Sequence, residues 1–287
     1  MPINDNIFLK IRELRNTMTP VEQMIAEYVL ENKERVPRFS VHALASGSRT
    51  SDASVLRFCK TLGYRGYRDF IVGLSAALGS ADDSRGEQYT DIQPGDDLQT
   101  IITNISLNNC KSIEDTMSVI DRGEIRKAVE LLRHSTRIDF YGVGASGLVC
   151  LDAQQKFARI GKISFAYTDG HSQLTAATLL HKNDVAVLIS NSGSTVEILD
   201  TLGVAKEAGA SIIAITRYTK SELASQADVV LNISTPEITI RSGAMGSRIA
   251  MLDIVDILFA GVASEDYKNV KKYLMKTHNV LMIKHKL

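Results

Sequence analysis

The most constraining feature of the sequence is a regular alternation of short β-branched runs with helical segments between residues 138 and 233. The runs predict strands at Ile138–Gly142, Ile163–Tyr167, Val185–Ser190, Ile212–Thr216 and Val229–Ile233. Helical periodicity between most of them predicts helices at Ser146–Ile160, His171–His181 and Val196–Ala208. Strands that alternate with helices form parallel sheets, because each helix returns the chain to the same end of the sheet. We therefore expect an α/β domain built on a doubly wound parallel sheet.

The segments around this alternation set the expected domain limits. A helical run at about Leu98–His134 precedes the strands, and a helix at about Met245–Ala263 and a basic tail helix follow them. Residues 79–100 hold one basic and six acidic residues and few large apolar ones, which is typical of a linker. We expect domains at residues 1–78 and 101–287, joined by this acidic linker.

The first 78 residues carry the pattern of an all-α helix-turn-helix domain. Thr19-Pro20-Val21-Glu22 forms a capping box with proline at the first helical position. A second short helix is expected to begin near Ser40, and a third to span Ser51–Leu62. The third helix has an apolar face made of Val55, Phe58, Cys59 and Leu62. Two short helices separated by a few residues predict a helix-turn-helix.

Positive charge gathers on this third helix, although the whole chain has a net charge of zero. Residues 49–68 contain five basic residues and one acidic residue. The side opposite the apolar face is expected to read double-stranded DNA, with phosphate contacts from flanking cations. The predicted DNA-binding residues are Arg49, Ser51, Asp52, Ser54, Arg57, Lys60, Arg65 and Arg68.

Two loops rich in glycine and serine follow predicted strands. One is Gly142-Val-Gly-Ala-Ser-Gly147, and the other is Ser190-Asn-Ser-Gly-Ser-Thr195. Ligands of open α/β sheets bind outside the carboxyl ends of the strands, where these loops are expected. The second loop offers hydroxyl groups and a helix N-terminus to an anion but no lysine, which favours a phosphomonoester over a nucleoside triphosphate. Ser194 and Glu197 also form a capping box, so some hydroxyls could serve only the helix.

The first loop also fits a different ligand. It matches the pattern G-x-G-x-x-G, and Asp169 follows the second predicted strand, where dinucleotide-binding folds place a ribose-binding acid. An NAD(H)-sensing repressor with a Rossmann domain is therefore an alternative. The second serine-rich loop has no role in such a fold, whereas a sugar phosphate would use both loops.

The two halves together resemble the RpiR family of bacterial regulators, in which a helix-turn-helix domain is joined to a sugar isomerase (SIS) domain. The resemblance covers about Met18–Leu74, including MTPVEQMIAEYVLEN and ASVLRFCKTLGYRGYRDF, and about Ile101–Val262. Residues 190–195 fit the SIS pattern S-x-S-G-x-T, and residues 241–248 also look characteristic of these regulators. Arg49 departs from the family, which usually has a small turn residue, often glycine, at this position.

The resemblance implies a sugar-phosphate site with no further cofactor and no metal. Its residues would be Ser146, His171, Ser190, Ser192, Ser194, Thr195, Glu237 and Arg241. His171 would face the sugar from the segment TDGHSQL, which is similar to that of amino-sugar regulators. The resemblance therefore points to an N-acetylhexosamine 6-phosphate, with N-acetylmannosamine 6-phosphate ahead of its glucosamine and muramic relatives. We also expect a homodimer or a higher homo-oligomer, because helix-turn-helix proteins usually read two half-sites.

SIS domains also occur in sugar-phosphate isomerases, so an enzyme is a second alternative. An isomerase needs a general base near C1 and C2, for which His171 and Glu237 are candidates. The fused DNA-binding domain favours a sensor, and we expect a non-enzymatic transcriptional regulator, a repressor of sugar-catabolic genes. The absence of a signal peptide or a membrane segment and the scattered Cys59, Cys110 and Cys150 predict a cytoplasmic protein.

Overall fold

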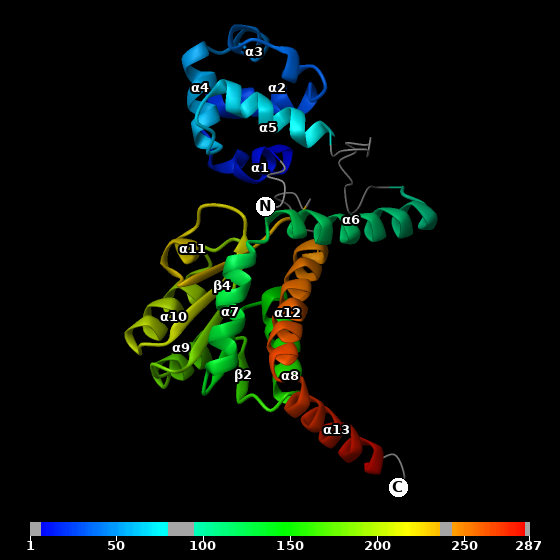
Figure 1. Ribbon diagram of the computed structural model, residues 1–287, viewed down its shortest axis with the longest axis vertical. Helices are drawn as coiled ribbons and strands as arrows, with labels where there is room; N and C mark the ends of the chain where they lie inside the picture. The colour runs from blue at the N-terminus through cyan, green and yellow to red at the C-terminus, as the bar shows by residue number, and fades with distance from the viewer. Residues whose placement is uncertain (1–6, 80–94, 236–242, 285–287) are drawn as a thin grey trace. The chain divides into compact units, whose positions relative to one another are not determined.

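The computed structural model describes residues 7–79, 95–235 and 243–284. The chain divides into two compact units. One contains Met1–Tyr89 with Tyr218–Lys220, and the other contains Thr90–Arg217 with Ser221–Leu287 (Figure 1). Most of the predicted linker, residues 80–94, lies outside the described residues, and Leu98–Thr100 already belong to a helix.

The first unit is helical, as predicted. Its elements are α1 (Ile7–Leu14), η1 (Arg15–Thr17), α2 (Pro20–Glu31), η2 (Val36–Arg38), α3 (Val41–Gly47), α4 (Asp52–Thr61) and α5 (Tyr67–Gly79). The side chains of Thr19, Ser40 and Ser51 cap α2, α3 and α4 by accepting a hydrogen bond from the backbone N–H three residues later. The capping box predicted at Thr19 and Glu22 is present in full. Helices α1 and α5 were not predicted from the sequence.

The core of this unit forms around α4. Val55, Phe58, Cys59 and Leu62 are fully buried, as their spacing predicted. The ring of Phe58 meets that of Phe70 on α5 edge to face, with 5.8 Å between centroids. Cys59 is a free, buried cysteine, and burial raises the pKa of its thiol to about 12, which keeps the thiol protonated. The two unpredicted helices thus complete the core on which α4 rests.

The second unit contains a five-stranded parallel sheet, which confirms the predicted fold class. Its strands are β1 (Ile138–Tyr141), β2 (Ser164–Tyr167), β3 (Val185–Ile189), β4 (Ser211–Arg217) and β5 (Val229–Ile233). Their order in the sheet is β2-β1-β3-β4-β5, and every pairing is parallel. This is the flavodoxin-like order, in which the direction of winding reverses between β1 and β3.

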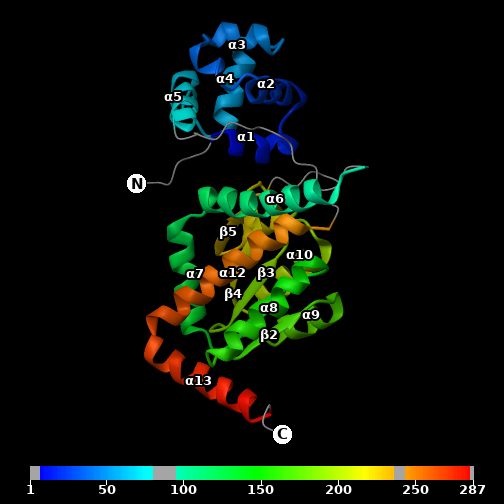
Figure 2. The same ribbon diagram turned by 90° about the vertical axis from the view of Figure 1, so that its right-hand side faces the viewer.

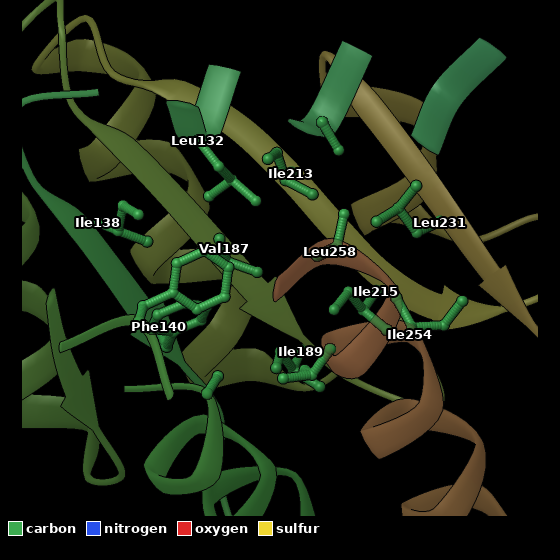
Figure 3. Close-up of a cluster of buried hydrophobic side chains, with 14 of the residues drawn as sticks. Leu132, Ile138, Phe140, Val187, Ile189, Ile213, Ile215, Leu231, Ile254 and Leu258 are labelled. Carbon is green, nitrogen blue, oxygen red and sulfur yellow. The ribbon is translucent and has the colours of Figure 1, made fainter. Parts of the chain in front are cut away.

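Helices cover both faces of this sheet (Figure 2). The helices of this unit are α6 (Leu98–Val119), α7 (Arg122–His134), α8 (Ala145–Arg159), α9 (Gly170–Thr178), α10 (Val196–Glu207), α11 (Glu222–Gln226), α12 (Met245–Glu265) and α13 (Tyr267–Lys284). Residues of α7, α8 and α12 share one buried cluster with the sheet, part of which Figure 3 shows. Residues of α9, α10 and α11 form the cluster on the opposite face. The sheet is therefore buried on both faces, and a ligand can reach it only at the ends of its strands.

Two helical predictions needed correction. The run predicted at Leu98–His134 is two helices, because Asp121 caps α7 by accepting hydrogen bonds from the backbone N–H groups of Gly123 and Glu124. Helix α11 was missed because it has only five residues. Within the described ranges, no helix has the length and apolar character needed to cross a membrane.

Candidate functional site

The turn between α3 and α4 places the predicted DNA-binding residues. Helix α3 ends in a Schellman motif, in which the N–H of Thr50 donates to the carbonyl of Ala45 (2.8 Å) and that of Arg49 donates to Ser46 (3.2 Å). The residue at the turn of this motif is left-handed, and here it is Arg49, with φ of 55°. A non-glycine residue in this conformation is strained. Arg49, which departs from the family pattern, therefore lies at a strained position just before α4.

The exposed face of α4 differs in part from the predicted one. Ser51, Asp52, Arg57 and Lys60 are exposed, as expected. Placing Ser54 on this face was wrong: its side chain is buried, since its hydroxyl is 2.9 Å from that of Ser51 and accepts a hydrogen bond from Arg57 (3.3 Å).

Two apolar residues that the sequence analysis missed, Ala53 and Leu56, are exposed on α4. The predicted phosphate-contacting residues Arg49, Arg65 and Arg68 lie on both sides of this helix in sequence, and Arg65 and Arg68 are exposed. In the part of the chain that the structure describes, none of these three arginines is in an ion pair with a carboxylate. Their charges are therefore available to a polyanion.

In the second unit, residues 190–195 form what we call the hydroxyl loop, between β3 and α10. The Ser190 hydroxyl lies 2.9 Å from that of Thr195 and 3.5 Å from that of Ser192, and the last two are 3.4 Å apart. The backbone N–H of Gly193 donates to the Ser190 hydroxyl (3.1 Å), and that of Ser194 donates to the Ser192 hydroxyl (3.3 Å). Three hydroxyls thus converge at the N-terminus of a helix, which is a suitable arrangement for an anion.

The capping box suggested for Ser194 and Glu197 is absent. Helix α10 begins after Thr195, and no side chain among the described residues caps it through a hydrogen bond. The first turn of α10 therefore offers backbone N–H groups that no described side chain satisfies. Ser192 and Ser194 are exposed, whereas Ser190 is buried.

Gly193 fixes the shape of the hydroxyl loop. Its φ is +63°, and a Cβ atom there would lie 2.2 Å from the Ser221 hydroxyl and 2.9 Å from that of Thr216. Its carbonyl accepts a hydrogen bond from the N–H of Leu223 on α11 (3.1 Å). The loop is therefore held against the end of β4 and the start of α11, and any side chain at this position would displace it.

Residues 142–147 form what we call the glycine loop, between β1 and α8. Gly144 has φ of 58° and ψ of −128°, a conformation open essentially to glycine alone. A Cβ on Gly142 would lie 2.8 Å from the sulfur of Cys150. Ser146 is half-buried in the first turn of α8, with its hydroxyl 3.9 Å from the sulfur of Met251 on α12. Since β1 and β3 are neighbours, the two loops flank the point where the winding of the sheet reverses.

The first turn of α9 contacts both the glycine loop and helix α10, which follows the hydroxyl loop. Gln173 is fully buried, and its side-chain amide donates to the carbonyls of Gly142 (3.2 Å) and Tyr167 (3.0 Å) while its carbonyl accepts from the Thr201 hydroxyl of α10 (3.3 Å). A Cβ on Gly170 would lie 3.3 Å from the side chain of Glu197 on α10. The α9 N-terminus therefore packs on the glycine loop and on the helix that follows the hydroxyl loop.

His171 lies in this first turn and is exposed. His171, which was predicted to face the sugar, precedes the buried Gln173 by two residues in the sequence. Gln173 itself was missed by the sequence analysis, since a glutamine at a helix start gives no sign of being buried. Glu237 and Arg241, also predicted as site residues, lie outside the described residues.

The features that suggested NAD have structural explanations. Asp169 caps α9 by accepting a hydrogen bond from the N–H of Ser172 (3.0 Å), and this bond holds the pKa of the carboxyl below its usual range. Gly142, Gly144 and Gly147 are accounted for by close packing or positive φ. The strand order is also the flavodoxin-like one and not that of a dinucleotide-binding fold. The G-x-G-x-x-G match therefore does not indicate a dinucleotide.

Comparisons with known proteins agree with this geometry. Residues 131–261 match the SIS domain, and residues 5–81 match the helix-turn-helix domain of the rpiR family. An uncharacterised helix-turn-helix transcriptional regulator of Caldanaerobacter subterraneus is 43% identical over 97% of this chain and 98% of its own. Another, from Bacillus subtilis, is 35% identical over 93% and 94% of the two chains. The structure of the Vibrio vulnificus NanR protein complexed with ManNAc-6P is similar with a TM-score of 0.60, at 27% identity over 96% and 98% of the chains.

These findings define the class of protein: a helix-turn-helix transcriptional regulator that carries a SIS domain. The chain belongs to the RpiR family of such regulators.

Proposed function

We propose that this regulator is a repressor of sugar-catabolic genes whose operator binding is modulated by N-acetylmannosamine 6-phosphate. The observation that carries the proposal is the convergence of the Ser190, Ser192 and Thr195 hydroxyls at an uncapped helix N-terminus beside the winding reversal of the sheet. The NanR protein, which is similar over nearly its whole length, is described as complexed with this sugar phosphate.

Each part of the site has a role in the proposal. The hydroxyl loop, including Ser194, binds the phosphate through hydroxyl and amide donors, which suit a phosphomonoester without a lysine. Ser146 at the start of α8 contacts the phosphate or a neighbouring sugar hydroxyl from the opposite side of the winding reversal. His171 contacts the sugar. The family resemblance adds Glu237 and Arg241, of the same or a neighbouring subunit, to the residues that bind the ligand.

The same proposal assigns no catalysis to the chain. The similar full-length proteins are called transcriptional regulators, and a sensor requires only that the ligand bind one arrangement of the protein more tightly than another. The first unit binds double-stranded operator DNA through α4 and its flanking arginines. The regulator acts as a homodimer or a higher homo-oligomer, which places two copies of α4 on two half-sites.

Calorimetry on the full chain tests the ligand site. N-acetylmannosamine 6-phosphate should bind, whereas the unphosphorylated sugar should bind at least a hundredfold more weakly, because the hydroxyl loop would have no phosphate to hold. Ser192→Ala should weaken binding by about 1–3 kcal/mol, the cost of leaving a charged acceptor unpaired. Ser264→Ala is the matched control, since Ser264 is an exposed serine on α12 with its hydroxyl bonded to the carbonyl of Gly261.

Two results would contradict the proposal. Equal binding of the free sugar and its phosphate would mean that the hydroxyl loop does not hold a phosphate. Nuclear magnetic resonance can monitor the sugar phosphate in the presence of the protein over several hours. Its conversion to a second sugar phosphate would show that the chain is an isomerase.

A further inference from the structure

An apolar side chain lies in the middle of the exposed face of α4. Leu56 is 43% exposed, and Ala53, one turn before it, is exposed as well. With Arg57 and Lys60 they occupy positions i, i+3, i+4 and i+7, which form one stripe along the helix. The buried residues of α4 occupy the opposite side. The exposed stripe is therefore half apolar and half cationic.

Single exposed leucines are common on proteins, so exposure alone decides nothing. The surroundings of Leu56 are more specific. Arg57 and Lys60 follow it on the same stripe, and residues 49–68 carry five basic residues against one acidic residue. A surface of this charge complements a polyanion and not an apolar protein partner. The partner of the stripe must then be negatively charged and must also present an apolar group.

Duplex DNA presents such a group in its major groove. The one apolar feature of the base edges there is the C5 methyl group of thymine, while guanine offers acceptors for arginine or lysine. The recognition helix of a helix-turn-helix meets base edges through its N-terminal residues, and Ala53 and Leu56 lie in the first half of α4.

We propose that Leu56, with Ala53 beside it, contacts thymine methyl groups in each half-site and so determines part of the operator sequence. The inference rests on the proposed DNA binding by α4 and adds what that helix reads. Arg57 and Lys60 bind guanine edges or phosphates next to the contacted thymine. The charged residues are the ones that sequence reasoning selects, whereas Leu56 supplies discrimination that charge does not.

Replacing thymine by uracil in the DNA tests this inference, because the change removes only the methyl group. Duplexes bound by the full-length protein are first selected from a random pool, and the affinity of the selected duplex is measured by fluorescence anisotropy. Each thymine is then replaced by uracil in turn. At least one replacement in each half-site should weaken binding about fourfold, which corresponds to one apolar carbon returned to water.

The same titration with Leu56→Ala assigns the effect to this side chain. The variant should bind the thymine duplex more weakly than the unchanged protein does, and the penalty for uracil should fall below twofold. Val72→Ala is the control, because Val72 is an exposed apolar residue on a different helix, α5, and it should keep the full penalty. Circular dichroism melts show whether the variants are folded. The uracil series on the unchanged protein tests the inference even if a variant fails to fold.

The outcomes separate the inference from the function on which it rests. Selection that enriches no sequence overturns both. An enriched sequence that tolerates uracil at every position leaves DNA reading intact and overturns the inference. A uracil penalty that persists in Leu56→Ala also overturns it, because another side chain then contacts the methyl group.

Discussion

Replacing Arg49 by glycine should make the protein more stable and its DNA binding weaker. Arg49 occupies the left-handed position of the Schellman motif that ends α3, with φ of 55°. In α4 and α10 the corresponding residues are Gly63 and Gly209, with φ of 83° and 85°. The chain therefore uses glycine for the same backbone geometry elsewhere, and arginine at residue 49 is the exception.

The expected gain follows from two opposing terms. A left-handed conformation costs a residue with a Cβ about 1–2 kcal/mol. Glycine removes this cost, but it also destabilises the folded state by about 0.5–1 kcal/mol, because its backbone has more conformational entropy in the unfolded chain. The net stabilisation by Arg49→Gly is then about 0.5–1 kcal/mol. In a unit of this size, such a change should raise the midpoint of its thermal transition by about 5 °C.

Scanning calorimetry on the full chain measures this shift in the thermal midpoint. DNA titrations at several salt concentrations measure the loss of DNA affinity. A plot of log affinity against log salt has a negative slope, and removing one phosphate contact should make it shallower by about 0.9 for each half-site that the protein occupies. Arg49→Ala is the matched control, since it removes the charge but keeps the Cβ and the strain. It should lose the same DNA affinity without the gain in stability. A glycine variant that melts at or below the temperature of the unchanged protein would refute the strain argument.

Three further predictions concern other parts of the structure. Gln173→Ala should destabilise the second unit by about 2 kcal/mol and weaken sugar-phosphate binding, because the carbonyls of Gly142 and Tyr167 lose a buried donor; unchanged urea denaturation would contradict this. Burial raises the pKa of Glu22, but hydrogen bonds from Thr61 and Thr19 outweigh it and hold that pKa below its usual value of 4.5. The ionised Glu22 side chain should contribute its full stabilisation above pH 4.5 and lose it as the pH falls through the lowered pKa. Glu22→Gln should therefore flatten the dependence of the melting temperature on pH below 5. The same dependence in the variant and the unchanged protein would contradict this prediction. Light scattering should give the mass of a dimer or a larger oligomer, and a monomer with and without DNA would rule out two-fold operator reading.

The fold was largely predictable because its signals are local. The strand β5 was predicted at its observed limits, and the buried face of α4 followed from helical spacing alone. Asp121, an N-cap followed three residues later by Glu124, carried a sign of the break between α6 and α7 that the sequence analysis did not use. Short α11 lacked enough residues to show a period.

The site was less predictable because its details depend on neighbours that are distant in sequence. Ser54 was assigned to the exposed face on polarity, yet its contacts with Ser51 and Arg57 leave it buried. Leu56 was overlooked for the converse reason, since an apolar residue is expected to be buried. Gln173 connects the glycine loop to helix α10 through partners 31 and 28 residues away, and no local pattern predicts such bonds.

The most direct test of the account is the affinity of the selected operator duplex in the presence and absence of saturating N-acetylmannosamine 6-phosphate. The proposed function requires the two ligands to be coupled, and such couplings usually change affinity between about fivefold and 150-fold. The DNA must then change the affinity for the sugar phosphate by the same factor, which calorimetry on the complex measures. Operator affinity that stays the same when the sugar phosphate is bound would contradict the account, because the two units would then work independently.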